Sequence, residues 1–385
     1  MNIAFLSSYF HHHQKYVADE LYRITGKRYH FIVKKSLSDS LIKVGYHEYE
    51  NEGYLVQSSN GISTEAQNVI DEADVLIVGG QSEKWIHNRK KQGKVIIRYA
   101  ERPLKKGIEL WKYPVRFFRW HRENPKVLPI YMLCSSAFTS ADYSKFFLFR
   151  NRAYKWGYFP ECIRYDVDEL FSRKEPTEIL WCGRFIDWKH TDDTIRVAEK
   201  LKSEGYKFNL SIIGTGPMKD TLQAMISEFN LEDCVHLFDS MSPEEVRKHM
   251  EKAGIYLFTS DRQEGWGAVL NESMNSGCAV VASHAIGSVP FLMKNKENGL
   301  VYRSGDVDML YRKTKYLLDN PCEQRRLGRK AYETIVTKWN AEVAASRLVQ
   351  LSEAILNGEV SPDLFEDGPC SRAELIKDNW FYDEN

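Results

Sequence analysis

The stretch TEILWCGRF at residues 177–185 is a short apolar run that ends in a charged loop. Its central positions are apolar without alternation, so we expect both faces of a strand to be buried there. Comparable runs follow at intervals: FNLSIIGTG (208–216), CVHLFDS (234–240), GIYLFTS (254–260) and CAVVASH (278–284). Helix-length polar stretches separate them, which predicts a parallel sheet with helices on both faces.

The first half of the chain shows the same alternation. Its apolar runs are NIAFLSS (2–8), YHFIVKK (29–35), ADVLIVGG (73–80), KVIIRYA (94–100) and VLPIYMLCSS (127–136). Because 385 residues exceed what one hydrophobic core organises, we predict two Rossmann-like, doubly wound domains facing a cleft. We place them at 1–160 and 161–357, with the polar, proline-bracketed stretch 159–176 as the linker.

Two further segments carry structural predictions. Residues 191–203 are typical of an amphipathic helix that is capped by Thr191 and Asp192 and turns Ile195, Val197, Ala198 and Leu201 inward. Residues 358–385 are acidic and turn-rich. They are either a loose tail or a segment that docks on the first domain.

Composition limits the partners and the compartment. The 53 basic and 53 acidic residues cancel, which argues against nucleic acid as a partner. The seven cysteines are scattered and lack CxxC pairs, a pattern typical of reduced thiols and neither of disulfides nor of a zinc site. The N-terminus has no leader pattern and no run is long enough to span a bilayer, so we expect a cytoplasmic protein.

In open α/β sheets, ligands bind beyond the carboxyl ends of the strands. The loop after the first strand, SSYFHHHQ, lacks the glycine-rich turn of a dinucleotide site, which disfavours an NAD-dependent enzyme. The loop after 177–185 carries Arg184 and Lys189, two cations that could neutralise a diphosphate, although exposed cations are often only solvated. The turn GTGP at 214–217 would let a ligand approach the backbone.

The segment EGWGAVLNE at 264–272 is the strongest signal. Gly265 and Gly267 follow Glu264 in a loop, and Ala268 begins a predicted helix whose first N–H groups could hold a phosphate. Glu272 lies further along that helix. Ionised carboxylates accept paired hydrogen bonds from diols, so the two glutamates suit a ribose and a sugar ring.

With these motifs in order, residues 179–339 resemble the retaining glycosyltransferases of family 4, which have the GT-B fold. The E-x7-E signature stands here as Glu264 to Glu272, followed by Ser273, Met274 and GCAVVAS; GR…K, GxGP and NGL also match. The resemblance implies that Arg184 and Lys189 bind the donor diphosphate, Glu272 the ribose and Glu264 the transferred sugar. It further implies that Gly183, Gly214, Gly216, Gly265, Trp266, Gly267 and Ala268 shape the donor site.

The reaction implied is transfer of a sugar from a nucleotide-diphosphate sugar with retention of configuration, without a metal or another cofactor. We expect a glycan or lipid-diphosphate-linked acceptor in capsular or other surface polysaccharide synthesis. A sugar-nucleotide epimerase or a phosphorylase of the same fold, and a catalytically silent sugar-nucleotide-binding partner, remain alternatives.

The first half matches this family only in layout. Where many members place a histidine beside the anomeric centre, this chain has RYAERP, with Glu101 and Arg102. Some capsule-type enzymes are similar in carrying HHQ after the first strand, so His13 and Gln14 are acceptor-side candidates with Glu101 and Arg102. Three adjacent histidines are also common in exposed turns.

Residues 104–126 interleave aromatic and cationic side chains. Such a helix or loop could lie on an anionic membrane surface, which would place the protein peripherally at the inner face of the membrane. Equally, it could pack its aromatic face on the first domain.

Overall fold

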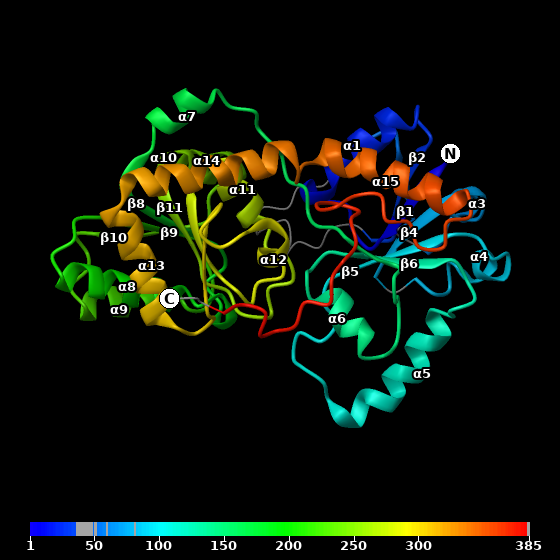
Figure 1. The fold of residues 1–385 in the computed structure, drawn as a ribbon, viewed down its shortest axis with the longest axis horizontal. Helices are drawn as coiled ribbons and strands as arrows, with labels where there is room; N and C mark the ends of the chain where they lie inside the picture. Colours follow the sequence, from blue (N-terminus) through cyan, green and yellow to red (C-terminus); the bar gives the residue numbers. More distant parts are fainter. Residues whose placement is uncertain (36–48, 50–51, 59–60, 81, 383–385) are drawn as a thin grey trace. The chain divides into compact units, whose positions relative to one another are not determined.

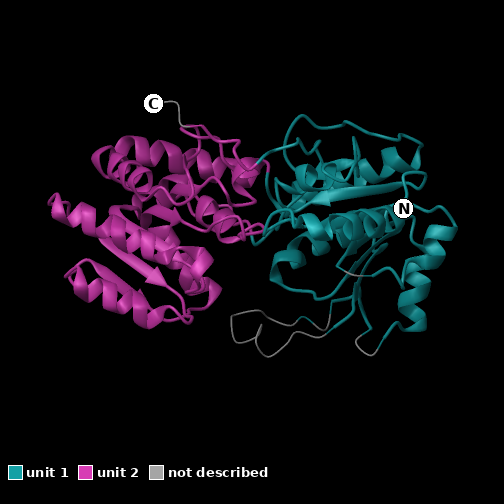
Figure 2. Cartoon of the chain, turned by 90° about the horizontal axis from the view of Figure 1, so that it is seen from below, with its two compact units in different colours: residues 1–161, 339–377 teal, residues 162–338, 378–385 magenta. Residues whose placement is uncertain are grey.

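The computed structural model describes residues 1–35, 49, 52–58, 61–80 and 82–382, which form two compact units (Figure 2). Unit 1 comprises residues 1–161 and 339–377, and unit 2 comprises residues 162–338 and 378–385. The first crossing lies within one residue of the expected boundary. The chain crosses between the units twice more, after residues 338 and 377, and neither crossing coincides with a predicted boundary.

Unit 1 contains a parallel sheet in the order β3-β2-β1-β4-β5-β6-β7 (Figure 1). Its strands are β1 (Ile3–Ser7), β2 (Tyr29–Val33), β3 (Leu55–Gln57), β4 (Val75–Gly79), β5 (Ile96–Ala100), β6 (Ile130–Cys134) and β7 (Ala153–Lys155). Its helices are α1 (His12–Ile24), α3 (Thr64–Glu72), α4 (His87–Lys91), α5 (Tyr113–Glu123), α6 (Thr139–Ser144) and α15 (Ala341–Leu356). Every residue of β4 and β6 is buried, as expected for a sheet covered on both faces.

Unit 2 contains a second parallel sheet in the order β10-β9-β8-β11-β12-β13. Its strands are β8 (Glu175–Cys182), β9 (Asn209–Ile213), β10 (Val235–Phe238), β11 (Ala253–Phe258), β12 (Ala279–Ser283) and β13 (Leu300–Tyr302). Helices α8 (Thr191–Ser203), α9 (Lys219–Glu228) and α13 (Val307–Asp319) cover one face. Helices α10 (Pro243–Lys252), α11 (Val269–Asn275) and α14 (Pro321–Thr337) cover the other (Figure 1). The two sheets confirm the predicted doubly wound α/β class.

Helix α15 was expected in the second domain, within 161–357, but it belongs to unit 1. It packs along α1, and Figure 1 shows the two helices side by side. Its apolar face buries Leu348, Leu351 and Ile355. That face alone does not reveal which domain receives it, so the sequence could not place the helix.

Helix α8 has the predicted bounds, and its four inward residues are buried. The predicted cap is wrong. The N-cap is His190, which has a left-handed backbone (φ 49°) and no side-chain capping bond. Because the 3-10 turn Asp187–Lys189 leads directly into His190, Thr191 and Asp192 are already helical.

The stretch expected to be a linker is folded beyond residue 161. Helix α7 (Val167–Ser172) lies within it, capped by Asp166, whose side chain accepts a hydrogen bond from the Glu169 N–H. Leu170 and Phe171 pack with Tyr332 of α14 in unit 2. The polar residue Asp166 in this stretch therefore caps a short helix and does not mark a flexible connection.

The C-terminal segment divides between the units, and its last three residues lie outside the described part of the chain. Residues 358–377 run along β7, with Arg372 bridging Tyr154 in antiparallel sense and Lys155 pairing with Asp367 at 3.1 Å. They therefore cover an exposed sheet edge of unit 1. Residues 378–382 lie on unit 2. Across the described residues, no helix combines the length and apolarity of a membrane span.

Candidate functional site

The predicted donor residues meet at the carboxyl edge of the second sheet. Arg184 and Lys189 follow β8, Gly214 and Gly216 follow β9, and Glu264 follows β11. These three strands are neighbours, and the strand order reverses between β8 and β11. Parallel sheets bind ligands at such a switch point, so the topology brings the motifs together where a ligand is expected.

Lys189 and Glu264 form an ion pair at this edge, and both side chains are largely buried. The hydroxyl of Ser260 donates to the same Glu264 carboxylate at 3.0 Å. The Lys189 ammonium lies 4.9 Å from the centre of the Trp188 ring, and its backbone carbonyl accepts from the Thr259 hydroxyl at 2.6 Å. The pair is thus held by loops from both sides of the switch point.

Glu272 lies in α11 and is partly buried. Within the described ranges, no group donates a hydrogen bond to its carboxylate. Burial raises its pKa, and the positive charge of Arg247 opposes this shift only in part. A buried carboxylate without donors is costly, so this group is poised to accept hydrogen bonds from a ligand.

Arg184 is exposed at the end of β8, and the structure gives its guanidinium no ion pair or hydrogen bond among the described residues. It differs in this from Lys189, whose charge is already neutralised by Glu264. Arg184 is therefore available to an anionic ligand without breaking an existing contact.

The structure explains why glycine is required at several positions of this edge. A Cβ atom on Gly214 would lie 1.9 Å from the Gly183 carbonyl oxygen, and one on Gly216 would lie 2.4 Å from the Phe185 carbonyl oxygen. The loops after β8 and β9 therefore pack backbone to backbone, and the glycines permit that contact. Gly267 has a left-handed backbone (φ 82°), and a Cβ atom on it would lie 2.4 Å from the Phe258 ring.

Trp266 was expected to shape the donor site, but its side chain is completely buried. Its indole N–H donates to the Asn271 side chain at 2.9 Å, and its ring lies near Phe291. The ring anchors the loop to α11 and cannot touch a ligand. Ala268, the N-cap of α11, is also largely buried, and Gly265 is buried between Glu264 and Trp266.

In unit 1, Glu101 follows β5 and accepts a hydrogen bond from the Tyr158 hydroxyl at 2.6 Å. Its other carboxylate oxygen pairs with Lys105 at 2.6 Å. The His13 ring stacks on Tyr158, with centroids 5.4 Å apart. Burial lowers the pKa of His13 and lowers that of His11 to about 4, so both imidazoles are neutral at pH 7. They can exchange hydrogen bonds with hydroxyls but cannot act as phosphate-binding cations.

The other two acceptor-side candidates are buried. Arg102 is 2% exposed, pairs with Asp142 at 3.3 Å and stacks on Phe138. It stabilises the loop after β5, so the prediction that it faces an acceptor is wrong. Gln14 is 6% exposed, and its side-chain oxygen has no hydrogen-bond donor among the described residues.

Several neighbours of the site were not predicted from the sequence. Ser260 and Arg247 surround the two glutamates, and Tyr158 links His13 to Glu101. In unit 2 the C-terminal segment also reaches this edge: Asp378 pairs with Arg262 at 3.4 Å, and the Trp380 indole donates to the His284 carbonyl at 2.9 Å. Ser260 and Tyr158 follow the ends of β11 and β7, but only β11 was predicted as a strand, so the strand-end rule could have found Ser260 and not Tyr158 or Arg247.

Residues 165–334, less than half of the chain, match the family described as glycosyl transferases group 1. The chain is 27% identical over 186 residues to the amylovoran biosynthesis glycosyltransferase AmsK of Erwinia amylovora, covering 47% of this chain and 46% of that protein. It is 34% identical over 155 residues to an N-acetylgalactosaminyltransferase of Campylobacter jejuni that acts on a diphospho-undecaprenol-linked sugar, covering 40% of each. The chain thus aligns with half or less of these curated relatives.

Among solved structures, the chain resembles Anabaena Alr3699/HepE in complex with UDP, with a TM-score of 0.69 and 12% identity over 92% of this chain and all of that one. A glycosyltransferase from Rickettsia africae gives a TM-score of 0.68 with 12% identity over 93% of this chain and 99% of that one. These likenesses establish the GT-B fold of two parallel α/β sheets. The family match covers unit 2 from β8 to α14, the part that contains the paired glutamates.

Proposed function

We propose that the chain is a retaining glycosyltransferase that moves a sugar from a nucleotide-diphosphate sugar to a glycan or lipid-linked acceptor in polysaccharide synthesis. The observation that carries the proposal is Glu272 of α11, a partly buried carboxylate to which no group in the described part of the chain donates a hydrogen bond. A ribose diol supplies the two hydroxyl donors that such a carboxylate lacks.

The diphosphate is assigned to Arg184 and Lys189. Arg184 is exposed and has no partner among the described residues, so it can bind a phosphate directly. Lys189 is paired with Glu264, and a bound donor would insert between them. Its phosphate would then replace Glu264 beside the ammonium, while a sugar hydroxyl would donate to the released carboxylate. The ion pair therefore holds both groups in place before the donor arrives.

In the proposed reaction, the bond between the anomeric carbon and the β-phosphate oxygen breaks while the acceptor oxygen bonds to the same face of that carbon. The acceptor proton passes to the departing phosphate, and the products are the nucleoside diphosphate and the glycosylated acceptor. Negative charge grows on the phosphate as the bond breaks, so Arg184 and Lys189 stabilise the transition state more than the ground state. No metal is required in this scheme because two cations provide that stabilisation.

The acceptor is assigned to the carboxyl edge of unit 1, beside Glu101, Tyr158 and His13. This cluster supplies one carboxylate, one hydroxyl and neutral imidazoles, which suit hydroxyl-rich ligands. We further propose that the reaction takes place in the cytoplasm, which the pattern of scattered cysteines supports.

A thermal-shift screen with UDP-, GDP-, ADP- and dTDP-sugars tests the donor site, because a ligand at a hundred times its dissociation constant stabilises by about 2.7 kcal/mol. The nucleotide sugar that stabilises the protein is then incubated with glycan and polyprenyl-diphosphate acceptors with and without EDTA. Retention predicts that the anomeric signal of the product matches that of the donor. Binding without turnover on any acceptor would contradict the transferase assignment and favour a silent binding partner.

A further inference from the structure

Helix α5 of unit 1 has two apolar faces, and only one of them is covered. Tyr113, Phe117 and Trp120, at helical spacing, pack inward against Phe146 and Leu148. Trp111, Val115 and Phe118 recur at the same spacing on the opposite side, where they are 76%, 69% and 74% exposed. The inward face therefore packs on unit 1, as one of the two predictions for residues 104–126 states. This packing does not explain the exposed outward face.

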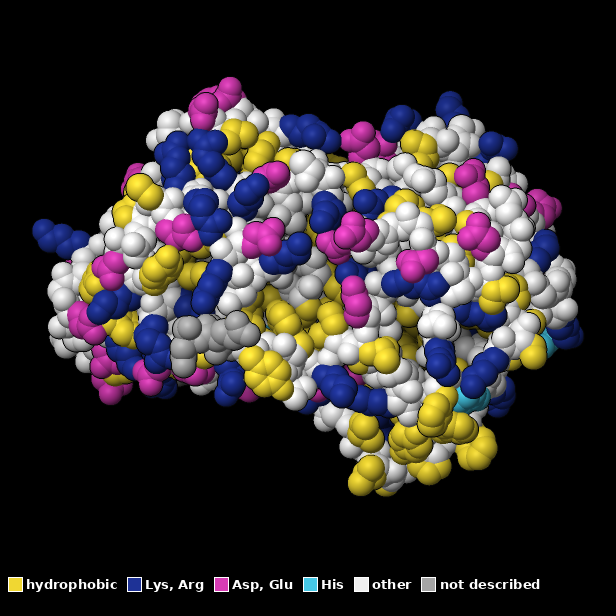
Figure 3. Space-filling model, viewed as in Figure 1, with side chains coloured by type: hydrophobic (Ala, Val, Ile, Leu, Met, Phe, Trp, Pro, Cys, Tyr) yellow, Lys and Arg dark blue, Asp and Glu magenta, His cyan; other side chains and the backbone are white. Residues whose placement is uncertain are grey.

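Two further exposed apolar side chains lie close to α5 in the fold: Leu110 is on the turn before it, and Phe147 is next in sequence to Phe146, which packs against Tyr113. Leu110 is 81% exposed on the turn before α5, and Phe147, on the loop after α6, is 67% exposed. Figure 3 shows hydrophobic side chains gathered at the position that α5 occupies in Figure 1. We call these residues the apolar patch: Leu110, Trp111, Val115, Phe118 and Phe147. Scattered single apolar residues are ordinary on protein surfaces, but a group of five with two phenylalanines and a tryptophan indicates a binding surface.

The surroundings of the apolar patch are strongly basic. Residues 104–126 contain seven lysines and arginines and two glutamates, a local net charge of +5 in a chain whose net charge is zero. Three of these cations, Lys106, Arg122 and Lys126, have no carboxylate partner among the described residues. Arg150, beside Phe147, is a fourth such cation. Exposed apolar side chains among unneutralised cations match a surface that is anionic outside and apolar beneath.

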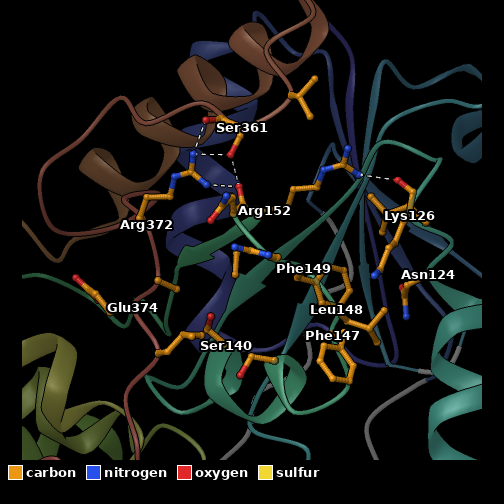
Figure 4. A pocket seen from close by; sticks show the side chains of 18 of the residues that line it. Asn124, Lys126, Ser140, Phe147, Leu148, Phe149, Arg152, Ser361, Arg372 and Glu374 are labelled. Atoms are coloured by element: carbon orange, nitrogen blue, oxygen red, sulfur yellow. Dashed lines mark hydrogen bonds between the residues drawn. The ribbon is translucent and has the colours of Figure 1, made fainter.

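A hollow of about 1160 Å³ adjoins this region in unit 1, and its lining includes Arg150 together with Lys126 and Phe147, which Figure 4 labels. Arg152 and Arg372 also line it, but their guanidinium groups donate to backbone carbonyls, as the dashed lines in Figure 4 show. Of these four cations, Lys126 and Arg150 are therefore the two that are available to an outside partner. The basic character of the patch thus continues around the loop after α6.

We propose that the apolar patch and its surrounding cations dock unit 1 on an anionic phospholipid bilayer. Trp111, Phe118 and Leu110 enter the interface between headgroups and acyl chains, while Lys106, Arg122, Lys126 and Arg150 contact lipid phosphates. A second copy of the chain is disfavoured as occupant, because an isologous contact would bring two basic surfaces together. The inference does not depend on the donor site, which lies in unit 2.

Co-sedimentation with vesicles tests the proposal on the full chain. The wild type is mixed with phosphatidylcholine vesicles, with or without phosphatidylglycerol, at low and at high salt. We expect binding only to the anionic vesicles and at least about tenfold weaker binding at high salt. The absence of binding to anionic vesicles at low salt would overturn the proposal.

Two sets of variants separate the apolar and the electrostatic contributions. Trp111→Ser with Phe118→Ser should reduce the vesicle partition coefficient at least about tenfold, because both side chains would leave the bilayer interface. Tyr316→Ser, at an exposed aromatic residue of α13, is the matched control and should bind like the wild type. Arg122→Gln with Lys126→Gln should weaken binding to anionic vesicles, whereas Lys207→Gln in unit 2 should not.

All these positions are exposed, so the variants should unfold at the wild-type temperature, and circular dichroism checks this. Vesicle binding that persists unchanged in the Trp111 and Phe118 variant would contradict the proposal. Analytical ultracentrifugation provides the remaining outcome. A concentration-dependent dimer that the same variant abolishes, without vesicle binding by the wild type, would show that a second copy covers the patch instead.

Discussion

Lys189 and Glu264, 75 residues apart, form an ion pair across the switch point of the second sheet. Lys189 follows β8 and Glu264 follows β11, two neighbouring strands. In the proposed function, Lys189 binds the donor diphosphate and Glu264 binds the transferred sugar. Because both side chains are largely buried, removing one partner leaves an uncompensated charge. This pair therefore connects the stability of unit 2 to the occupancy of its proposed site.

Replacing one member of the pair should destabilise the protein. For Lys189→Ala we expect a loss on the order of 2 kcal/mol in the free energy of unfolding, somewhat below the value for a fully buried pair. Urea denaturation measures it. The double variant Lys189→Ala with Glu264→Gln should recover part of that loss, because it removes the stranded charge. Additive losses in the double variant would show that the two side chains are not coupled.

Arg184→Ala should leave stability nearly unchanged and weaken sugar transfer. Its side chain is exposed and bound to no described residue, so unfolding should change by less than about 0.5 kcal/mol. Sugar transfer should fall at least about tenfold, since a charge-assisted contact to the diphosphate is lost. Lys207→Ala, an exposed cation away from the switch point, is the control. Undiminished transfer by Arg184→Ala would refute the assignment.

The acidity of Glu272 predicts two opposite pH effects. Burial raises its pKa in the folded protein above that in the unfolded chain, so the folded state binds the proton more tightly. Its contribution to stability is therefore present at low pH and is lost as pH rises from the unfolded pKa through the raised folded pKa. In Glu272→Gln this loss should disappear, which acid-range denaturation curves measure.

Donor binding should show the reverse trend, because the ribose hydroxyls donate to the ionised carboxylate. Affinity should weaken as pH falls through the raised pKa of Glu272, at a pH above that of an ordinary glutamate. Calorimetric titrations at several pH values measure this. An affinity that stays constant down to the normal range of a glutamate would contradict the role given to Glu272.

The end of the chain should stabilise unit 2. Phe381 is 6% exposed and lies near the His284 ring, so Phe381→Ala should cost about 1–3 kcal/mol. Its neighbour Tyr382 is 68% exposed, and Tyr382→Ala should have little effect. Thermal unfolding of the two variants compares them directly. Equal melting temperatures would show that the segment does not dock in solution.

Strands of four or more residues could be predicted from the sequence, including β10 at the edge of the second sheet, and strands of three residues could not. Ten apolar runs correspond to ten of the strands, all of them four residues or longer. The three that were missed, β3, β7 and β13, each have three residues and lie at a sheet edge. So short a strand carries no periodic pattern and is defined by pairing with its neighbour.

The residues of the site also fall into two groups, those that the sequence predicts and those whose orientation depends on packing. Glu264, Arg184 and Lys189 follow apolar strands, and the strand-end rule was enough to bring them together. Trp266 and Arg102 stand at equally suitable positions in the sequence, yet both are buried and hold loops in place. Whether a side chain after a strand turns toward the ligand or back into the core depends on packing with distant residues such as Asn271 and Asp142.

The most direct test of the donor site is a calorimetric titration of the wild type, Glu272→Ala and the control Glu228→Ala with the nucleotide sugar found in the thermal-shift screen. Glu228 is an exposed glutamate at the end of α9. We predict that Glu272→Ala raises the dissociation constant about tenfold to a hundredfold, as loss of hydrogen bonds to a charged group requires, while Glu228→Ala leaves it unchanged. Equal dissociation constants for all three proteins would contradict the account.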